Sequence, residues 1–201
     1  MISDFVKGKK KFDYPLAIQR GIALHRAIDT FTDSHDLTRR AKAVFRADYG
    51  LYAGPLVDVA YDHFLARDPV AWAAAGDAPS GIEEREVADR LKVFSQKTYE
   101  QLSGWQALFP ERFARMFPYM RTQDWLYHYR YREGIFNSFA GLVRRAAYMP
   151  DSAAACRIFE DRYKELGDCY REFFPALRDF ARGTLQGMQG GPEGMEGRAE
   201  A

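Results

Sequence analysis

Three side chains that can bind a metal ion recur at intervals of four residues near the start of this chain: His25, Asp29 and Asp33. Residues four apart lie one above the other on an α-helix, so a helical segment would present all three along one stripe. Ile22 and Phe31 of the same segment are apolar, which predicts that part of the helix is buried. Charged groups on a partly buried helix need compensating partners, and a divalent metal ion is one such partner.

A second group of this kind follows about thirty residues later, where the chain carries Asp58, Asp62 and His63. The surrounding residues are apolar, which favours a second partly buried helix. Adjacent side chains of a helix point in different directions, so Asp62 and His63 could both reach one ion only if this helix lay edge-on to it. Asp58, one turn before Asp62, is a candidate to orient the ligands from behind.

The composition fits one domain with a sizeable core. The chain has 201 residues, of which 47% are hydrophobic and 15% aromatic. Its 29 basic and 28 acidic residues nearly cancel, which argues against general nucleic-acid binding. A local basic patch is formed by Lys7, Lys9, Lys10 and Lys11.

The cysteine pattern and the apolar runs predict a cytoplasmic protein. Cys156 and Cys169 form neither a disulfide framework nor a Cys-x-x-Cys motif, so we expect free thiols. The first residues do not resemble a signal peptide. We expect no membrane span, because no apolar run approaches the required length.

Helical periodicity runs through nearly the whole chain, and no strand-like alternation is evident. First-turn prolines, capping residues and glycines divide the chain into about seven helices. The sequence therefore predicts an all-α fold with one helical domain over residues 1–185. Residues 186–201 are rich in Gly, Pro and Glu and lack apolar content, which predicts a disordered tail. The predicted helices begin near Pro15, Asp36, Pro55, Ser80, Pro110, Trp125 and Ala153. Gly134 is predicted to separate Trp125–Tyr131 from Ile135–Tyr148, and the last helix is predicted to run to about Gly183 with a bend at Pro175.

Three motifs follow one another near the N-terminus. The first two are Asp4-Phe5-Val6-Lys7-Gly8 and the segment from Gly21 to Asp33 with Leu24-His25-Arg26 and Asp29. The third is Asp58-Val59-x-Tyr61-Asp62-His63-Phe64-Leu65-Ala66, and two later segments are Trp125-Leu126-x-x-Tyr129 and Phe173-Phe174-Pro175. In their order and spacing these motifs, over residues 4–180, resemble those of the acyl carrier protein phosphodiesterase family.

This resemblance implies a fold, an activity and a cofactor. The family is all-helical and is a divergent relative of the HD-type phosphohydrolases. Its members are hydrolases that remove 4′-phosphopantetheine from holo acyl carrier protein, which links them to fatty acid biosynthesis and lipid metabolism. They need a divalent cation, typically Mn²⁺. Such an ion suits the reaction, because it neutralises a phosphate oxygen and lowers the pKa of a bound water.

The family motifs also imply which residues carry the chemistry. The metal-ligand candidates are His25, Asp29, Asp62, His63, Asp4 and Asp33. The candidate catalytic residues are Asp62, Asp29, Lys7 and Arg26, the last two as cations that hold phosphate oxygens. Imidazole and carboxylate ligands suit manganese, zinc and iron, so ligand type alone does not name the metal. The histidine-containing segment that precedes the first motif in the family does not occur here, so its role is not assigned.

Two other functions stay open from the residues alone. The chain could be an HD-like hydrolase of another phosphoester, such as a nucleotide, or a catalytically silent helical binding protein. His25 and Asp29 could equally form a helix-surface pair, worth a few tenths of a kcal/mol, and Asp33 could pair with a nearby base. Four arginines are either solvated or candidates to meet an acidic helix of the carrier protein: Arg130, Arg132, Arg144 and Arg145.

Overall fold

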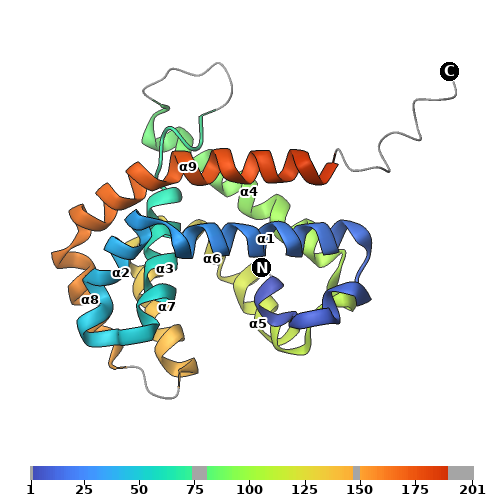
Figure 1. Cartoon of the computed structure of the whole chain (residues 1–201), viewed down its shortest axis with the longest axis horizontal. Coiled ribbons are helices and arrows are strands. Elements are labelled where there is room, and N and C mark those ends of the chain that lie inside the picture. Colours follow the sequence, from blue (N-terminus) through green and yellow to red (C-terminus); the bar gives the residue numbers. More distant parts are fainter. Residues whose placement is uncertain (1, 74–80, 147–149, 190–201) are drawn as a thin grey trace, which may run out of the picture.

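The computed structural model describes residues 2–73, 81–146 and 150–189, and this part of the chain contains helices and no β-strand (Figure 1). The all-α prediction is therefore confirmed, whereas the relation to HD-type phosphohydrolases stays a prediction. The α-helices are α1 (Leu16–Ser34), α2 (Asp36–Tyr49), α3 (Ala53–Leu65), α4 (Glu84–Ser103), α5 (Glu111–Thr122), α6 (Trp125–His128), α7 (Arg132–Arg145), α8 (Ser152–Asp161) and α9 (Tyr163–Gln189). Short 3₁₀ helices are η1 (Ser3–Phe5), η2 (Gly8–Asp13), η3 (Gly50–Tyr52) and η4 (Gln106–Leu108).

The predicted division after Trp125 is present, but α7 begins at Arg132, so Gly134 lies inside α7 and does not separate it from the single turn α6. Gly134 allows the close approach of the two helices, because a Cβ there would overlap the carbonyl oxygen of His128. The predicted long final helix breaks at Arg162 into α8 and α9. Helix α9 continues to Gln189, so residues 186–189 are helical and not part of a disordered tail. The rest of the predicted tail, residues 190–201, lies outside the described residues.

The larger of two aromatic-rich cores joins α2, α3, α7, α8 and α9. Phe45, Phe139 and Phe159 are completely buried in it. Their rings meet edge to face, with centroids about 6 Å apart, a favourable arrangement for aromatic pairs. This core holds α3 rigidly, and α3 carries Asp58 and Asp62.

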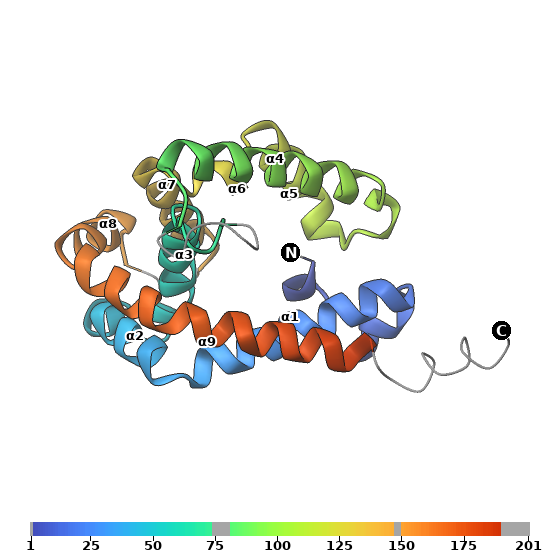
Figure 2. The same ribbon diagram turned by 90° about the horizontal axis from the view of Figure 1, so that it is seen from above.

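A smaller core lies between α4, α5 and the start of the chain. Phe113, Phe117 and Tyr99 are buried in it, and Phe5 of η1 packs against Phe113 with ring centroids 5.6 Å apart. The N-terminal segment is therefore held by the smaller core as well as by α1. In Figure 2 it lies between α1 and the layer formed by α4 and α5, while α3, α7 and α8 connect the two sides.

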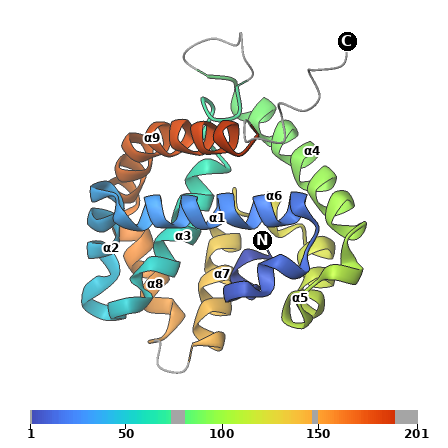
Figure 3. The same cartoon turned by 45° about the vertical axis from the view of Figure 1, so that its right-hand side comes forward.

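Helix α1 packs along α9 and against α2, and it runs past the N-terminal segment in Figure 3. Both η1 and η2 contact α1. The acidic side chains of η1 and α1 thus come from elements in contact, whereas those of α3 come from a helix of the larger core. None of the described helices has the length and apolar content needed to cross a membrane.

Candidate metal centre

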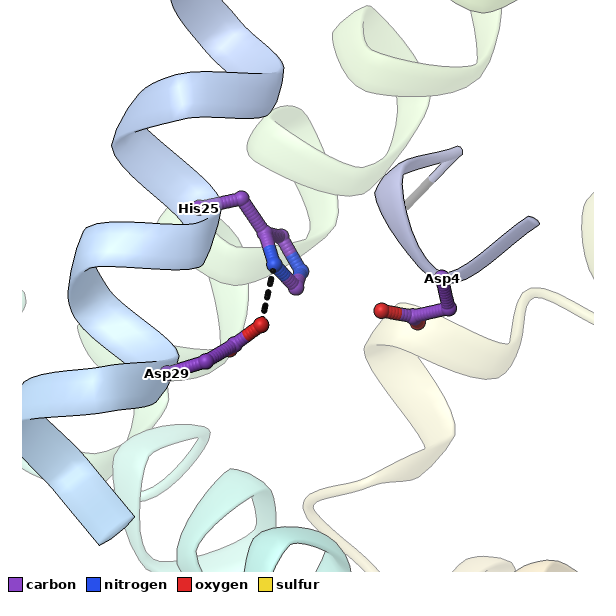
Figure 4. Close-up of side chains that lie close together, drawn as sticks. All are labelled: Asp4, His25 and Asp29. Carbon is purple, nitrogen blue, oxygen red and sulfur yellow. Dashed lines mark hydrogen bonds and ion pairs between the residues drawn. The ribbon is translucent and has the colours of Figure 1, made fainter. Parts of the chain in front are cut away.

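Two of the residues on the α1 stripe meet a carboxylate from the start of the chain. Asp4 of η1, His25 and Asp29 each place one donor atom within 4.8 Å of the others. The Nδ1 atom of His25 lies 2.9 Å from Oδ2 of Asp29, as their spacing of four residues allows. In Figure 4 both side chains project from α1 towards Asp4, which faces them from the opposite side. The sequence predicted all three as metal-ligand candidates.

Asp4 reaches α1 because the backbone beside it is anchored on both sides. Phe5 packs into the smaller core, and Val6 is buried. The guanidinium of Arg26 donates a hydrogen bond of 2.6 Å from Nη2 to the carbonyl oxygen of Val6. These contacts hold η1 across α1, so Asp4 faces the donor atoms of His25 and Asp29.

Two further carboxylates, Asp58 and Asp62, lie one turn apart on the same face of α3. Both are exposed to solvent, and neither has a hydrogen bond or an ion pair with the described parts of the chain. Surrounding protein nevertheless limits their hydration, which raises the pKa of Asp62 to about 7, with the negative charge of Asp58 as the second cause.

Asp58 of α3 interacts electrostatically with the acidic cluster on η1 and α1. Its pKa is raised to about 6, first by the limited hydration of its carboxylate and then by the charges of Asp33, Asp29 and Asp4, while the charge of Lys42 opposes them. The negative charges in this region therefore repel one another, and they belong to Asp4, Asp29, Asp58 and Asp62. A cation is the natural compensation for these charges.

Asp33 lies one turn beyond Asp29 on α1 and forms an ion pair with Lys42 of α2, with 2.7 Å between Nζ and Oδ1. Its donor atoms do not join the group of Asp4, His25 and Asp29. The structure thus favours the pairing with a nearby base over the ligand role. Lys42 was missed from the sequence, because no spacing rule relates residues on two different helices.

His63 lies in the larger core and away from the acidic cluster. It is completely buried, and both ring nitrogens already have protein partners: the carbonyl oxygen of Tyr129 at 2.8 Å from Nδ1 and the hydroxyl of Tyr163 at 2.9 Å from Nε2. Burial lowers its pKa to about 4. In this arrangement neither nitrogen is open to a metal ion, so the structure replaces the predicted ligand role with a structural one.

The two predicted phosphate contacts have different surroundings. Arg26 is half-buried and uses one nitrogen to hold Val6, so it positions Asp4 as much as it offers charge to a ligand. Lys7 is exposed and has no ion pair with a carboxylate in the described ranges. Of the two, Lys7 is the one whose charge is free to meet an anion.

The donor set fits a divalent cation. Two donors at right angles on one ion, each about 2.1 Å from it, lie about 3 Å apart, close to the separation of the His25 and Asp29 donor atoms. Two carboxylates with one imidazole suit manganese, magnesium or iron better than a soft thiolate-loving ion. Asp58 and Asp62 add negative charge nearby. The backbone already places the donor atoms of Asp4, His25 and Asp29 within 4.8 Å of one another.

One cavity reaches the cluster, and another lies against α7 and one residue of α3. One, of about 310 Å³, includes His25 and is otherwise lined mainly by apolar side chains such as Ile22 and Trp105. The other, of about 910 Å³, is lined by polar and aromatic groups, among them Val59 of α3 and Tyr129. The charge of Asp62 is the second cause, after burial, of the raised pKa of the Tyr129 hydroxyl, so Asp62 acts electrostatically on one wall of this cavity. A bound ester at the cluster would have space beside His25.

Comparisons with known proteins agree on one family. A sequence model described as acyl carrier protein phosphodiesterase matches residues 1–177. A protein of that name from Yersinia pestis is 28% identical over 177 residues, which cover 88% of this chain and 85% of the relative. The one from Serratia proteamaculans is 28% identical over 90% of this chain and 88% of the relative. The one from Photorhabdus laumondii is 24% identical over 90% and 85%. No solved structure matches the chain significantly.

Proposed function

The chain belongs to the acyl carrier protein phosphodiesterase family, and we propose that it is a metal-dependent hydrolase of the phosphodiester that joins 4′-phosphopantetheine to holo acyl carrier protein. The observation that carries this proposal is the convergence of Asp4, His25 and Asp29 from two separate elements. The names of the relatives in three bacterial genera support the substrate.

In this proposal Asp4, His25 and Asp29 hold the divalent cation, with Mn²⁺ as the expected ion. When bound, the cation supplies positive charge to a phosphate oxygen and makes a water more acidic. Asp58 and Asp62 contribute the surplus negative charge that draws the cation to this place. Their role is electrostatic attraction, which is strongest where hydration is limited.

The substrate phosphate is oriented by the chain's own cations. Lys7 directly follows the segment that holds Asp4, and its exposed ammonium group is free to contact a non-bridging oxygen. Water adds to phosphorus, the bond from phosphorus to the serine oxygen of the carrier breaks, and the serine oxygen takes up a proton. The products are the apo carrier protein with a free serine hydroxyl and 4′-phosphopantetheine.

The intact mass of holo acyl carrier protein tests the proposal. Incubation with the protein and Mn²⁺ is expected to remove the mass of phosphopantetheine, and excess chelator is expected to prevent this loss. Asp29→Asn should abolish the loss, because it removes a charged donor. Asp48→Asn is the matched control, since Asp48 is an exposed carboxylate on α2, outside the cluster. An unchanged carrier mass with the folded, Mn²⁺-loaded protein would contradict the proposal.

A further inference from the structure

Lysines gather on η2, the short helix that follows Asp4, and all of them are exposed except the half-buried Lys11. Lys7 precedes it, and Lys9, Lys10 and Lys11 lie within it. None of the four ammonium groups forms an ion pair with a carboxylate in the described chain, and that of Lys11 lies over the ring of Phe12, 4.9 Å from its centroid. Neighbouring like charges without counter-charges repel one another and together attract an external anion.

Hydrogen bonds to α1 hold the lysine-bearing segment at both of its ends. Before η2, the carbonyl of Val6 is held by Arg26. After η2, the carbonyl of Tyr14 accepts a hydrogen bond of 2.7 Å from Nε2 of Gln19. Both donors belong to α1, so the lysine-bearing segment is attached to the same helix that carries His25 and Asp29. A partner bound there would be fixed relative to the metal-ligand group.

Apolar side chains are exposed beside the lysines. Phe12 is 62% exposed and Leu16, at the start of α1, is 51% exposed. Basic side chains next to exposed aromatic and aliphatic groups offer both of the contacts that a protein interface uses, with apolar contact at the centre and charge at the rim. Nucleic acid would use the lysines but would leave Leu16 without a role.

The arginines that the sequence suggested for an acidic partner are less available. Arg130 is largely buried and pairs with Glu84, and Arg132 pairs with Glu160 and stacks on Tyr163. Arg144 and Arg145 remain exposed, and they line the larger cavity on α7. The lysines of η2 are therefore a denser group of uncompensated charge than these four arginines.

We propose that the segment Lys7–Leu16 is the docking surface for an acidic face of the carrier protein, with Lys9, Lys10 and Lys11 meeting its carboxylates and Phe12 and Leu16 its apolar side chains. This inference rests on the proposed function. The lysines begin three residues after Asp4, so a carrier seated on η2 presents its modified serine to the group of Asp4, His25 and Asp29. Charge complementarity of this kind mainly raises the association rate.

Steady-state kinetics of Lys9→Glu/Lys10→Glu test the docking surface. We expect the KM for holo acyl carrier protein to rise about tenfold, with kcat changed less than about twofold, because surface charges act on association. Turnover of bis(4-nitrophenyl) phosphate, which has no protein surface, should not change. The matched control is Arg46→Glu/Arg157→Glu, which changes the same charge on exposed residues of α2 and α8, at the far end of the molecule from η2 in Figures 1 and 2.

Binding of fluorescently labelled apo acyl carrier protein separates this inference from the proposed function. Wild-type turnover with equal KM for both double variants would overturn the docking surface and leave the function standing. If the wild-type protein does not turn over holo acyl carrier protein, the proposed function fails. The docking surface would still be supported if the carrier bound to the wild type and to the control variant but not to Lys9→Glu/Lys10→Glu. Lysine-dependent binding of anionic lipid vesicles or of DNA, with no binding of the carrier, would overturn it in favour of a membrane or nucleic acid.

Discussion

The two faces of α3 differ in how their polar side chains are surrounded. The side chain of Asp62 faces solvent and other carboxylates, and its carboxylate has no hydrogen-bond partner in the described residues. The next residue, His63, is completely buried and has a partner for each ring nitrogen. A turn of about 100° between neighbours on a helix is enough to separate them.

The contrast also appears in their ionisation. The pKa of Asp62 is raised to about 7 by burial and by Asp58, whereas burial lowers the pKa of His63 to about 4. Limited hydration thus favours the neutral form of both groups, but only His63 has hydrogen-bond partners for its polar atoms. The carboxylates on the acidic face of α3 therefore repel one another without protein partners, whereas the histidine is part of the packed core.

The largest effect is expected on the acidic side. Asp4→Ala removes the only donor that the described η1 contributes to the metal-ligand group, while Phe5 and Val6 still anchor the segment. Loss of several kcal/mol of charge stabilisation lowers turnover of holo acyl carrier protein by about a thousandfold. Circular dichroism should show unchanged helicity, and a variant that keeps full Mn²⁺-dependent turnover would remove Asp4 from the site.

On the histidine side, His63→Ala is expected to lower the free energy of unfolding by about 3 kcal/mol, because it leaves a buried cavity and removes the partner of two part-buried polar groups. Urea denaturation measures the loss. Leu51→Ala is the control, since Leu51 is 93% exposed and its truncation should change stability by about 0.5 kcal/mol or less. If the His63→Ala variant were as stable as the wild type but no longer bound Mn²⁺, His63 would be a metal ligand after all.

A smaller effect of opposite sign is expected for Asp62→Asn in the metal-free protein. The folded state keeps a proton on Asp62 up to about pH 7, whereas an unfolded carboxyl loses it near pH 4. The folded state therefore binds more protons in this window, so the contribution of Asp62 to stability falls as the pH rises from about 4 to 7.

Asparagine removes this pH dependence. At pH 8 we expect a melting temperature about 2–4 °C above wild type, the shift for about 1 kcal/mol in a chain of this length. His63 contributes with the opposite sign, since its stabilisation is lost as the pH falls from about 6.5 towards 4. A melting temperature of Asp62→Asn below that of wild type at pH 8 would contradict repulsion among the carboxylates of the acidic face.

The smallest effect is expected for Asp33→Asn, which breaks the exposed ion pair with Lys42. Such pairs contribute about 1 kcal/mol or less, and turnover should stay within about tenfold of wild type because the metal-ligand group is intact. Steady-state kinetics and urea denaturation provide the two readouts. A loss as large as that of Asp4→Ala would restore Asp33 as a ligand.

The spacing of His25 and Asp29 could be read from the sequence because it lies within one helix, where geometry follows from residue number. The family motif supplied Asp4. The different fates of Asp62 and His63 could not be read, because they depend on which helices cover each face of α3. The break at Arg162 was also invisible, since neither proline nor glycine interrupts the helical pattern there.

Binding of Mn²⁺, followed by electron paramagnetic resonance of the free ion, tests the central claim most directly. The group of Asp4, His25 and Asp29 predicts one tight site in the wild-type protein, a large loss of affinity in Asp29→Ala, and wild-type affinity in Asp48→Asn. Equal affinity in wild type and Asp29→Ala, or the absence of any tight site in the wild type, would contradict a metal centre between η1 and α1.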